Sequence, residues 1–233
     1  MSAWRPTSNY LYGTPALPAR RPVTTSRTEL IHITIAFVVL SVDFTILISS
    51  WGQDLYTGVL RTSFSPYEIL FGVLAGFSGF LAHELAHKIS AERSGYWAEF
   101  RMSPFGLLLS LITSVLGFLW AAPGATVIGG MQDIRAWGRT SLAGPAMNLG
   151  EGAILVAAAG GVDLLGYGTL ASLLALVALI NAYFAAFNLL PFGPLDGRKV
   201  WTWNKGVWAG SFAVAVAFGI VMAIALFTSI RLV

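Results

Sequence analysis

The stretch "YEILFGVLAGFSGFLAHELAHKI", residues 67–89, decides the fold of this chain. It has the length of about 20 residues that a helix needs to cross a lipid bilayer. It nevertheless ends with His83, Glu84 and His87. Ionisable side chains inside a membrane segment are energetically costly and usually serve a function. The stretch therefore predicts a membrane-spanning helix that carries a polar site near one of its ends.

The composition of the whole chain agrees with a lipid environment. Its 233 residues are 56% hydrophobic and only 11% charged, whereas a soluble domain carries about 25% charged residues. The net charge is only +3, and the sequence contains no cluster of basic residues, so we expect no nucleic-acid partner. The absence of cysteine excludes disulfides and thiolate zinc sites. We therefore expect the lipid bilayer to be the main solvent of this protein.

Apolar runs follow a polar, proline-rich start and cover about residues 30–51, 67–89, 104–121, 140–160, 169–191 and 207–229. Most of these runs are close to the length of a membrane-spanning helix. We expect a flexible cytoplasmic tail at residues 1–28 and a single transmembrane domain at residues 29–233. The predicted fold class is an all-α polytopic membrane protein with five or six transmembrane helices.

The basic residues predict how the chain is oriented. Cytoplasmic loops of membrane proteins are enriched in Lys and Arg, and four arginines precede the first apolar run: Arg5, Arg20, Arg21 and Arg27. By the same rule, residues 88–103, 122–139 and 192–206 are expected in the cytoplasm. The apolar run at 105–121 then begins and ends on one side, which predicts a re-entrant segment. The expected location is the cell membrane, with several passes and a cytoplasmic N-terminus.

The two histidines of "HELAH" have the spacing of metal ligands. On a helix, His83 and His87 lie one turn apart on the same face, with Glu84 beside them, so both imidazoles can bind one Zn²⁺ ion next to a carboxylate. A catalytic zinc needs a third protein ligand. The remaining histidine, His32, is a weaker choice than Asp196 in "FNLLPFGPLDGRKV", whose prolines and glycines predict an unwound helix end.

Three motifs together resemble the site-2 protease family of intramembrane zinc metalloproteases. They are "HELAH" (83–87), "AGPAMN" (143–148) and "NLLPFGPLDG" (188–197). The resemblance implies one Zn²⁺ per chain, bound by His83, His87 and Asp196, with Glu84 as the catalytic base. The supporting motif residues are Gly144, Pro145, Asn148, Asn188, Pro191 and Gly197.

The expected function is a metalloendopeptidase that hydrolyses transmembrane protein substrates near the cytoplasmic face, as in regulated intramembrane proteolysis. Asn148 is expected to donate a hydrogen bond to the developing oxyanion, although a bond between helices is the alternative. Asp43, Glu151 and Asn181 could line a water path or form structural polar pairs. The sequence leaves these roles, the natural substrate and the oligomeric state open.

A short β-prone stretch, "ATVI" at residues 125–128, lies between prolines and glycines. We expect the edge of this strand to pair with an unwound substrate segment, because a helix keeps its amides in internal hydrogen bonds.

Two other readings of the same residues remain. A membrane metal-binding or transport protein without protease activity would use the same ligands but needs no base beside them. Another class of membrane zinc protease, such as one acting on prenylated proteins, also carries HExxH. That class would be expected to have a downstream glutamate ligand in place of Asp196.

Overall fold

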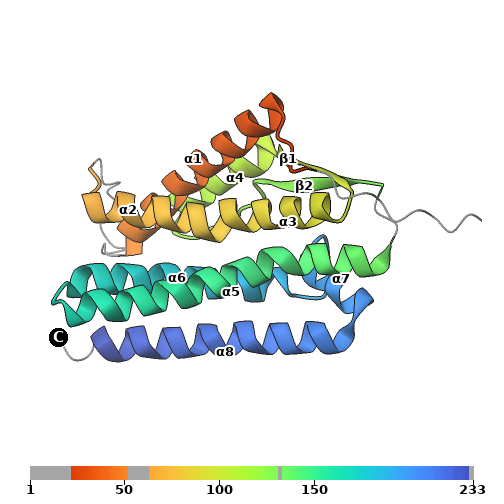
Figure 1. Ribbon diagram of the computed structural model, residues 1–233. Helices are drawn as coiled ribbons and strands as arrows, with labels where there is room; N and C mark the ends of the chain where they lie inside the picture. Colours follow the sequence, from red (N-terminus) through yellow and green to blue (C-terminus); the bar gives the residue numbers. More distant parts are fainter. Residues whose placement is uncertain (1–21, 52–62, 131–132, 231–233) are drawn as a thin grey trace, which may run out of the picture.

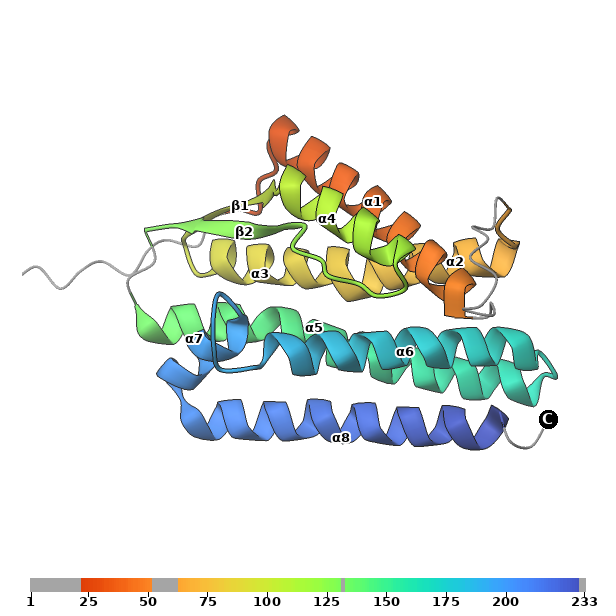
Figure 2. The same ribbon diagram turned by 180° about the vertical axis from the view of Figure 1, so that it is seen from behind.

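The computed structural model describes residues 22–51, 63–130 and 133–230. Its long helices lie side by side in layers (Figures 1 and 2). The elements in chain order are α1 (Arg27–Trp51), α2 (Pro66–Ala75), η1 (Gly76–Leu81), α3 (Ala82–Arg93), β1 (Trp97–Met102), α4 (Pro104–Val115), β2 (Gly124–Gly129), α5 (Ile134–Leu164), α6 (Gly168–Asn188), α7 (Asp196–Trp203) and α8 (Lys205–Ile230). Helix α3 packs on α5, α5 packs on α6, and α6 packs on α8.

Five helical stretches among the described residues are long and apolar enough to cross a membrane: Arg27–Ser49, Pro66–Arg93, Ile134–Leu164, Gly168–Asn188 and Lys205–Thr228. This confirms the predicted all-α polytopic fold. The second stretch joins α2, η1 and α3 into one continuous helix (Figure 1). The last stretch, in α8, has only 11% of its most apolar window buried. Because its exposed surface is apolar, α8 suits a helix that faces lipid.

The apolar run at 105–121 forms a much shorter helix than its neighbours. Helix α4 has 12 residues, which is about 18 Å at 1.5 Å per residue, less than the roughly 30 Å thickness of the hydrocarbon core. The two ends of the segment meet, because the Ser103 amide donates a hydrogen bond of 2.8 Å to the Pro123 carbonyl oxygen. The segment therefore returns to where it begins, as predicted for a re-entrant segment.

A two-stranded antiparallel sheet lies against α1 and α3. β1 pairs with β2 so that Phe100 is opposite Thr126 and Ala98 is opposite Ile128. Strand β2 confirms the predicted β-structure at residues 125–128. Strand β1 was expected only as part of a cytoplasmic loop. Its side chains alternate, with Ala98 and Phe100 buried, which is the pattern of a strand packed on one face.

The helix that carries the two histidines has a well-defined start and an irregular middle. Ser65 and Glu68 form a capping box, with Pro66 at the first helical position. The π-helical turn η1 lies directly before His83. Such turns are rare and often mark functional sites. The turn therefore sets which face of α3 points at the neighbouring helices.

A buried cluster of charged side chains connects α3 to α1 and β1. The Lys88 ammonium lies 2.9 Å from Glu29 Oε2 and 3.2 Å from Glu92 Oε1, and it donates to the Ala98 carbonyl oxygen at 2.8 Å. Each of these three charged side chains is at most 2% exposed. In the sequence, Lys88 is only one residue of the segment 88–103 that is expected in the cytoplasm, because its charge alone does not show burial. The cluster fixes α1, α3 and β1 relative to one another.

The predicted tail falls mostly outside the described residues. Within its last part, the Thr24 amide donates a hydrogen bond of 3.1 Å to Glu92 Oε2, and α1 already begins at Arg27. The segment just before α1 is therefore joined to the charge cluster on α3.

Candidate metal centre

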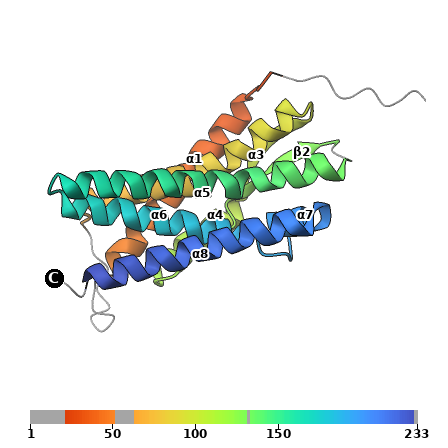
Figure 3. The same ribbon diagram turned by 60° about the horizontal axis from the view of Figure 1, so that its bottom comes forward.

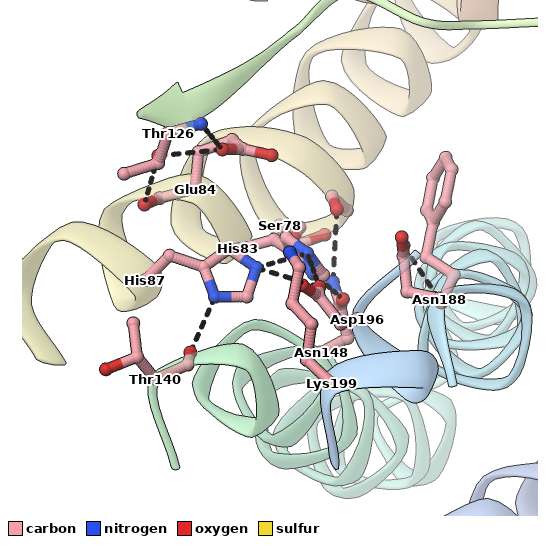
Figure 4. A network of polar contacts seen from close by, with 12 residues as sticks. Ser78, His83, Glu84, His87, Thr126, Thr140, Asn148, Asn188, Asp196 and Lys199 are labelled. Carbon is pink, nitrogen blue, oxygen red and sulfur yellow. Dashed lines mark hydrogen bonds and ion pairs between the residues drawn. The ribbon is translucent and has the colours of Figure 1, made fainter. Parts of the chain in front are cut away.

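Two helices bring three predicted ligands together: α3 carries His83 and His87, and Asp196 is the first residue of α7. Their ligand atoms all lie within 4.8 Å of one another. His83 Nε2 is 3.0 Å from His87 Nε2, and Asp196 Oδ2 is 2.9 Å from His87 Nε2 and 3.4 Å from His83 Nε2. Figure 4 shows these side chains close together, between α3 and the start of α7. The three residues thus form one buried cluster.

The far nitrogen of each imidazole has a partner that fixes the ring. His83 Nδ1 donates to Asn148 Oδ1 at 2.6 Å, and His87 Nδ1 donates to the Thr140 carbonyl oxygen at 2.7 Å. Hydrogen bonds of this kind orient metal-binding histidines. Because both Nδ1 atoms are occupied, the Nε2 atoms are left to bind a metal ion once they lose their protons.

The Asp196 carboxylate is held in its ionised form. Burial raises the pKa of Asp196, but the charge of His87 and the hydrogen bonds from both imidazoles outweigh burial and hold this pKa well below its usual value. Lys199 Nζ, one helical turn further along α7, donates to the other carboxylate oxygen at 3.2 Å. A divalent ion that replaces the imidazole protons would find an anionic ligand already in place.

Two glycines leave the space that this arrangement needs. A Cβ atom on Gly144 would lie 2.5 Å from Nε2 of both His83 and His87, so only glycine leaves that position free beside the two ligand atoms. A Cβ atom on Gly197 would lie 2.0 Å from the Leu189 carbonyl oxygen. Two imidazoles and one carboxylate are a common ligand set for zinc. The residues at this site therefore fit a zinc ion.

A cleft of about 280 Å³ opens beside the cluster. It is lined by the three predicted ligands, by Glu84 and by one edge of β2, together with apolar side chains such as Phe80 and Phe184. Glu84 points toward β2, where Thr126 donates to Glu84 Oε2 from its backbone nitrogen at 3.0 Å and from its hydroxyl at 2.8 Å (Figure 4). The predicted base, the predicted ligands and the predicted strand thus share one cleft.

Asn148 is fully buried, and both the oxygen and the nitrogen of its side-chain amide form hydrogen bonds. Besides accepting from His83, it donates through Nδ2 to the carbonyl oxygens of Ser78 and Gly79, at 3.0 and 3.1 Å, and to Asn181 Oδ1 at 3.0 Å. Asn181 in turn donates to Ser78 Oγ at 2.7 Å. These contacts connect η1, α5 and α6 behind His83. The oxyanion contact predicted for Asn148 is not tested by them and stays a prediction.

The remaining predicted residues lie around the cluster. Asn188 lines the cleft and donates to the Phe184 carbonyl oxygen at 3.1 Å. Pro145 is buried within α5, and Pro191 lies exposed in the turn between α6 and α7.

The other polar residues singled out in the membrane segments lie away from the three ligands. Asp43 accepts a hydrogen bond of 3.1 Å from Ser114 Oγ, which joins α1 to α4. Glu151 is half-buried in α5. His32, in α1, is not among the grouped ligand residues.

Comparison with known proteins gives the family. The chain is 34% identical over 152 residues to the "Putative zinc metalloprotease MJ0611" of Methanocaldococcus jannaschii, a match that covers 63% of this chain and 77% of the relative. It belongs to this family of zinc metalloproteases. The chain is also 32% identical over 181 residues to the "Putative zinc metalloprotease Rip3" of Mycobacterium tuberculosis, covering 71% of this chain and 41% of that protein. The chain thus spans less than half of Rip3. No family model matches the chain, and no solved structure matches it.

Several residues of this metalloprotease site were missed by sequence reasoning. Thr126, Thr140 and Lys199 contact Glu84, His87 and Asp196, respectively. Lys199 lies one helical turn from Asp196, so the spacing within α7 could have suggested it. Thr140 acts through its backbone carbonyl, which leaves no signal in the side-chain sequence. Thr126 was included in the predicted strand, but nothing in the sequence pairs it with Glu84.

Proposed function

We propose that this protein is an intramembrane zinc metalloendopeptidase of the site-2 protease type, in which His83, His87 and Asp196 bind one zinc ion. The observation that supports this most directly is the buried cluster of two imidazoles and one carboxylate, whose ligand atoms lie within 4.8 Å of one another. The ligands come from α3, which ends an apolar helical stretch, and from α7, which follows another. Its substrates would be transmembrane proteins, cleaved near the cytoplasmic face of the cell membrane.

Each residue of the site has its own role in the proposed reaction. A bound zinc ion lowers the pKa of its water to about 7 and polarises a carbonyl group. Glu84 accepts the proton of the attacking water and later transfers a proton to the leaving amine nitrogen. Asn148 holds His83, and Thr140 holds His87, so that both imidazoles keep one orientation. The apolar lining of the cleft limits access of bulk water to the scissile bond.

The exposed edge of β2 offers a place for the substrate. Among the described residues, β2 pairs only with β1, so its other edge is open toward the cleft. A substrate segment that unwinds from its helix can add to this edge as a strand. Its backbone would then run beside the metal ligands, with the scissile amide within the cleft.

Replacing Glu84 by Gln tests the proposal. Gln keeps the size of the side chain but cannot accept a proton, so we expect zinc binding to persist while cleavage of a single-span membrane substrate falls by about 10²–10⁴-fold. Zinc content and cleavage are measured on the same purified preparations. The control is Asp163→Asn, which removes an exposed carboxylate in the last turn of α5. Cleavage that survives Glu84→Gln would contradict the assignment of the base. A wild type that binds zinc but cleaves no substrate would instead favour a metal-binding or transport protein.

A further inference from the structure

The carboxylate of Glu84 is bonded to β2 in this structure and is not free in the cleft. Thr126 donates to Glu84 Oε2 from its backbone nitrogen at 3.0 Å and from its hydroxyl at 2.8 Å. The same hydroxyl also lies 3.2 Å from the Glu84 carbonyl oxygen. Figure 4 shows Glu84 reaching from α3 to the strand, where these contacts hold it. Two donors therefore hold this carboxylate oxygen against the strand.

The backbone amide that holds Glu84 belongs to the open edge of the sheet. In an antiparallel pair, the N–H and C=O groups of one residue point to the same side. Thr126 lies opposite Phe100, and the Phe100 amide donates to Glu29 Oε1 at 3.0 Å, away from β2. Thr126 and Phe100 thus form a pair that is not hydrogen-bonded across the ladder. The N–H and C=O of Thr126 therefore face the cleft.

Glu84 and an added strand compete for the same hydrogen. A peptide that extends the sheet at β2 must accept a hydrogen bond from the outward N–H groups of this strand, and the Thr126 N–H is one of them. This N–H has one hydrogen, and Glu84 Oε2 accepts it in the chain as it stands. Binding of a strand at Thr126 thus displaces the carboxylate from the backbone.

We infer that Thr126 is a positioning residue that restrains Glu84 until a substrate strand takes its place on β2. This inference rests on the proposed function, because it needs Glu84 as the base and β2 as the substrate edge. With the backbone N–H taken by the peptide, Glu84 keeps only the hydroxyl bond to Thr126, and it lies in the cleft that His83, His87 and Asp196 also line. Pairing of a peptide with the strand thus removes one of the two bonds that restrain the base, so peptide binding loosens the base.

If Thr126 restrains Glu84, a change at Thr126 alters the affinity for an extended peptide, whereas a purely structural contact would leave this affinity unchanged. Thr126→Val removes the hydroxyl donor but keeps the backbone N–H, the side-chain shape and the β-branching that suits a strand. With one donor lost, the remaining bond to Glu84 is easier to displace. We expect an extended peptide to bind this variant about tenfold more tightly than the wild type, the ratio for one hydrogen bond to a charged group. Thr126→Ser keeps the hydroxyl and should bind the peptide as the wild type does.

The experiment measures how tightly a hexapeptide binds to the metal-free chain in detergent. The peptide is fluorescent, apolar and extended, and its scissile bond is reduced. The variants are Thr126→Val, Thr126→Ser and Glu84→Ala, with Thr228→Val near the end of α8 as a matched control. We expect tighter binding for Thr126→Val and Glu84→Ala, and wild-type affinity for Thr126→Ser and Thr228→Val. A peptide of the same sequence with N-methylated amides cannot pair as a strand, so it should bind all variants equally weakly.

Steady-state cleavage by the zinc-loaded chain gives a second measurement. Release of the restraint predicts a lower KM for Thr126→Val, whereas a residue that only orients the base predicts a lower kcat with an unchanged KM. Equal peptide affinity for wild type and Thr126→Val, weaker affinity for Thr126→Val, or no binding of the peptide at all would overturn the inference. If the peptide results hold but the zinc-loaded wild type cleaves no membrane substrate, the proposed function fails while peptide capture at β2 stands.

Discussion

Asn148 connects the metal cluster to the helix bundle behind it. Its Oδ1 accepts from His83 Nδ1 at 2.6 Å, while its Nδ2 donates to oxygens of Ser78, Gly79 and Asn181. Since every one of these groups is buried, their hydrogen bonds cannot be replaced by water without rearrangement. The geometry favours a role in holding His83, whereas the sequence suggested a role at the oxyanion.

Replacing Asn148 by Ala separates the two roles. If Asn148 holds His83, the variant should bind zinc about 10–100-fold more weakly, the usual cost of losing a partner of a metal ligand. Competition with a chromogenic chelator measures this affinity, and Asn204→Ala, at the exposed start of α8, is the control. Zinc affinity equal to the wild type together with a lower kcat would instead support the oxyanion contact.

At the scale of the elements, the lengths of the apolar runs predicted the spans, and the β-prone residues predicted the strand at 125–128. The motif resemblance implied the cluster of His83, His87 and Asp196. The placement of the basic residues predicted a segment at 105–121 that returns, and α4 has that form. The short helix α7 and strand β1 were not predicted. Strand β1 is stabilised by contacts with residues remote in sequence, since the Phe100 amide donates to Glu29. Long-range contacts of this kind leave no periodic signal along the chain.

The cluster of Lys88, Glu29 and Glu92 joins α1, α3 and β1, so we expect a substitution in it to lower the stability of the fold. Lys88→Met removes the cation that contacts both buried carboxylates and leaves Glu29 and Glu92 without this ionic partner. We expect a loss of about 3–5 kcal/mol in the free energy of unfolding, the usual cost of breaking a buried ion pair. Reversible unfolding in mixed detergent measures this loss. Arg93→Met, at an exposed position of the same helix, should change stability by no more than about 0.5 kcal/mol, and an equal effect of both would contradict the role of the cluster.

At the scale of the whole molecule, the two ends of the bundle differ. Strand β2 and helix α7, which begins with Asp196, lie toward one end, and the turn between α5 and α6 lies at the other (Figure 3). The basic loops predicted to face the cytoplasm are at the end that holds the cluster. In the proposed orientation, substrates would be cut near the inner surface of the membrane.

The two ends of α5 allow this orientation to be tested. Because the natural chain has no cysteine, single cysteines at Arg135 and Leu165, both exposed, give unambiguous labelling sites. A membrane-impermeant maleimide should label Leu165→Cys in intact cells and Arg135→Cys only after permeabilisation. The reverse pattern would place the metal cluster at the outer surface, and labelling of both sites in intact cells would show that α5 does not cross the membrane.

Two imidazoles and one carboxylate, brought together by α3 and α7, form the proposed site for one zinc ion. X-ray diffraction from the zinc-loaded chain at the zinc absorption edge measures this most directly. We expect one anomalous peak, about 2.0–2.2 Å from His83 Nε2, His87 Nε2 and an oxygen of Asp196. A peak away from these atoms, or one bound by the two histidines while the Asp196 carboxylate stays beyond bonding distance, would contradict it.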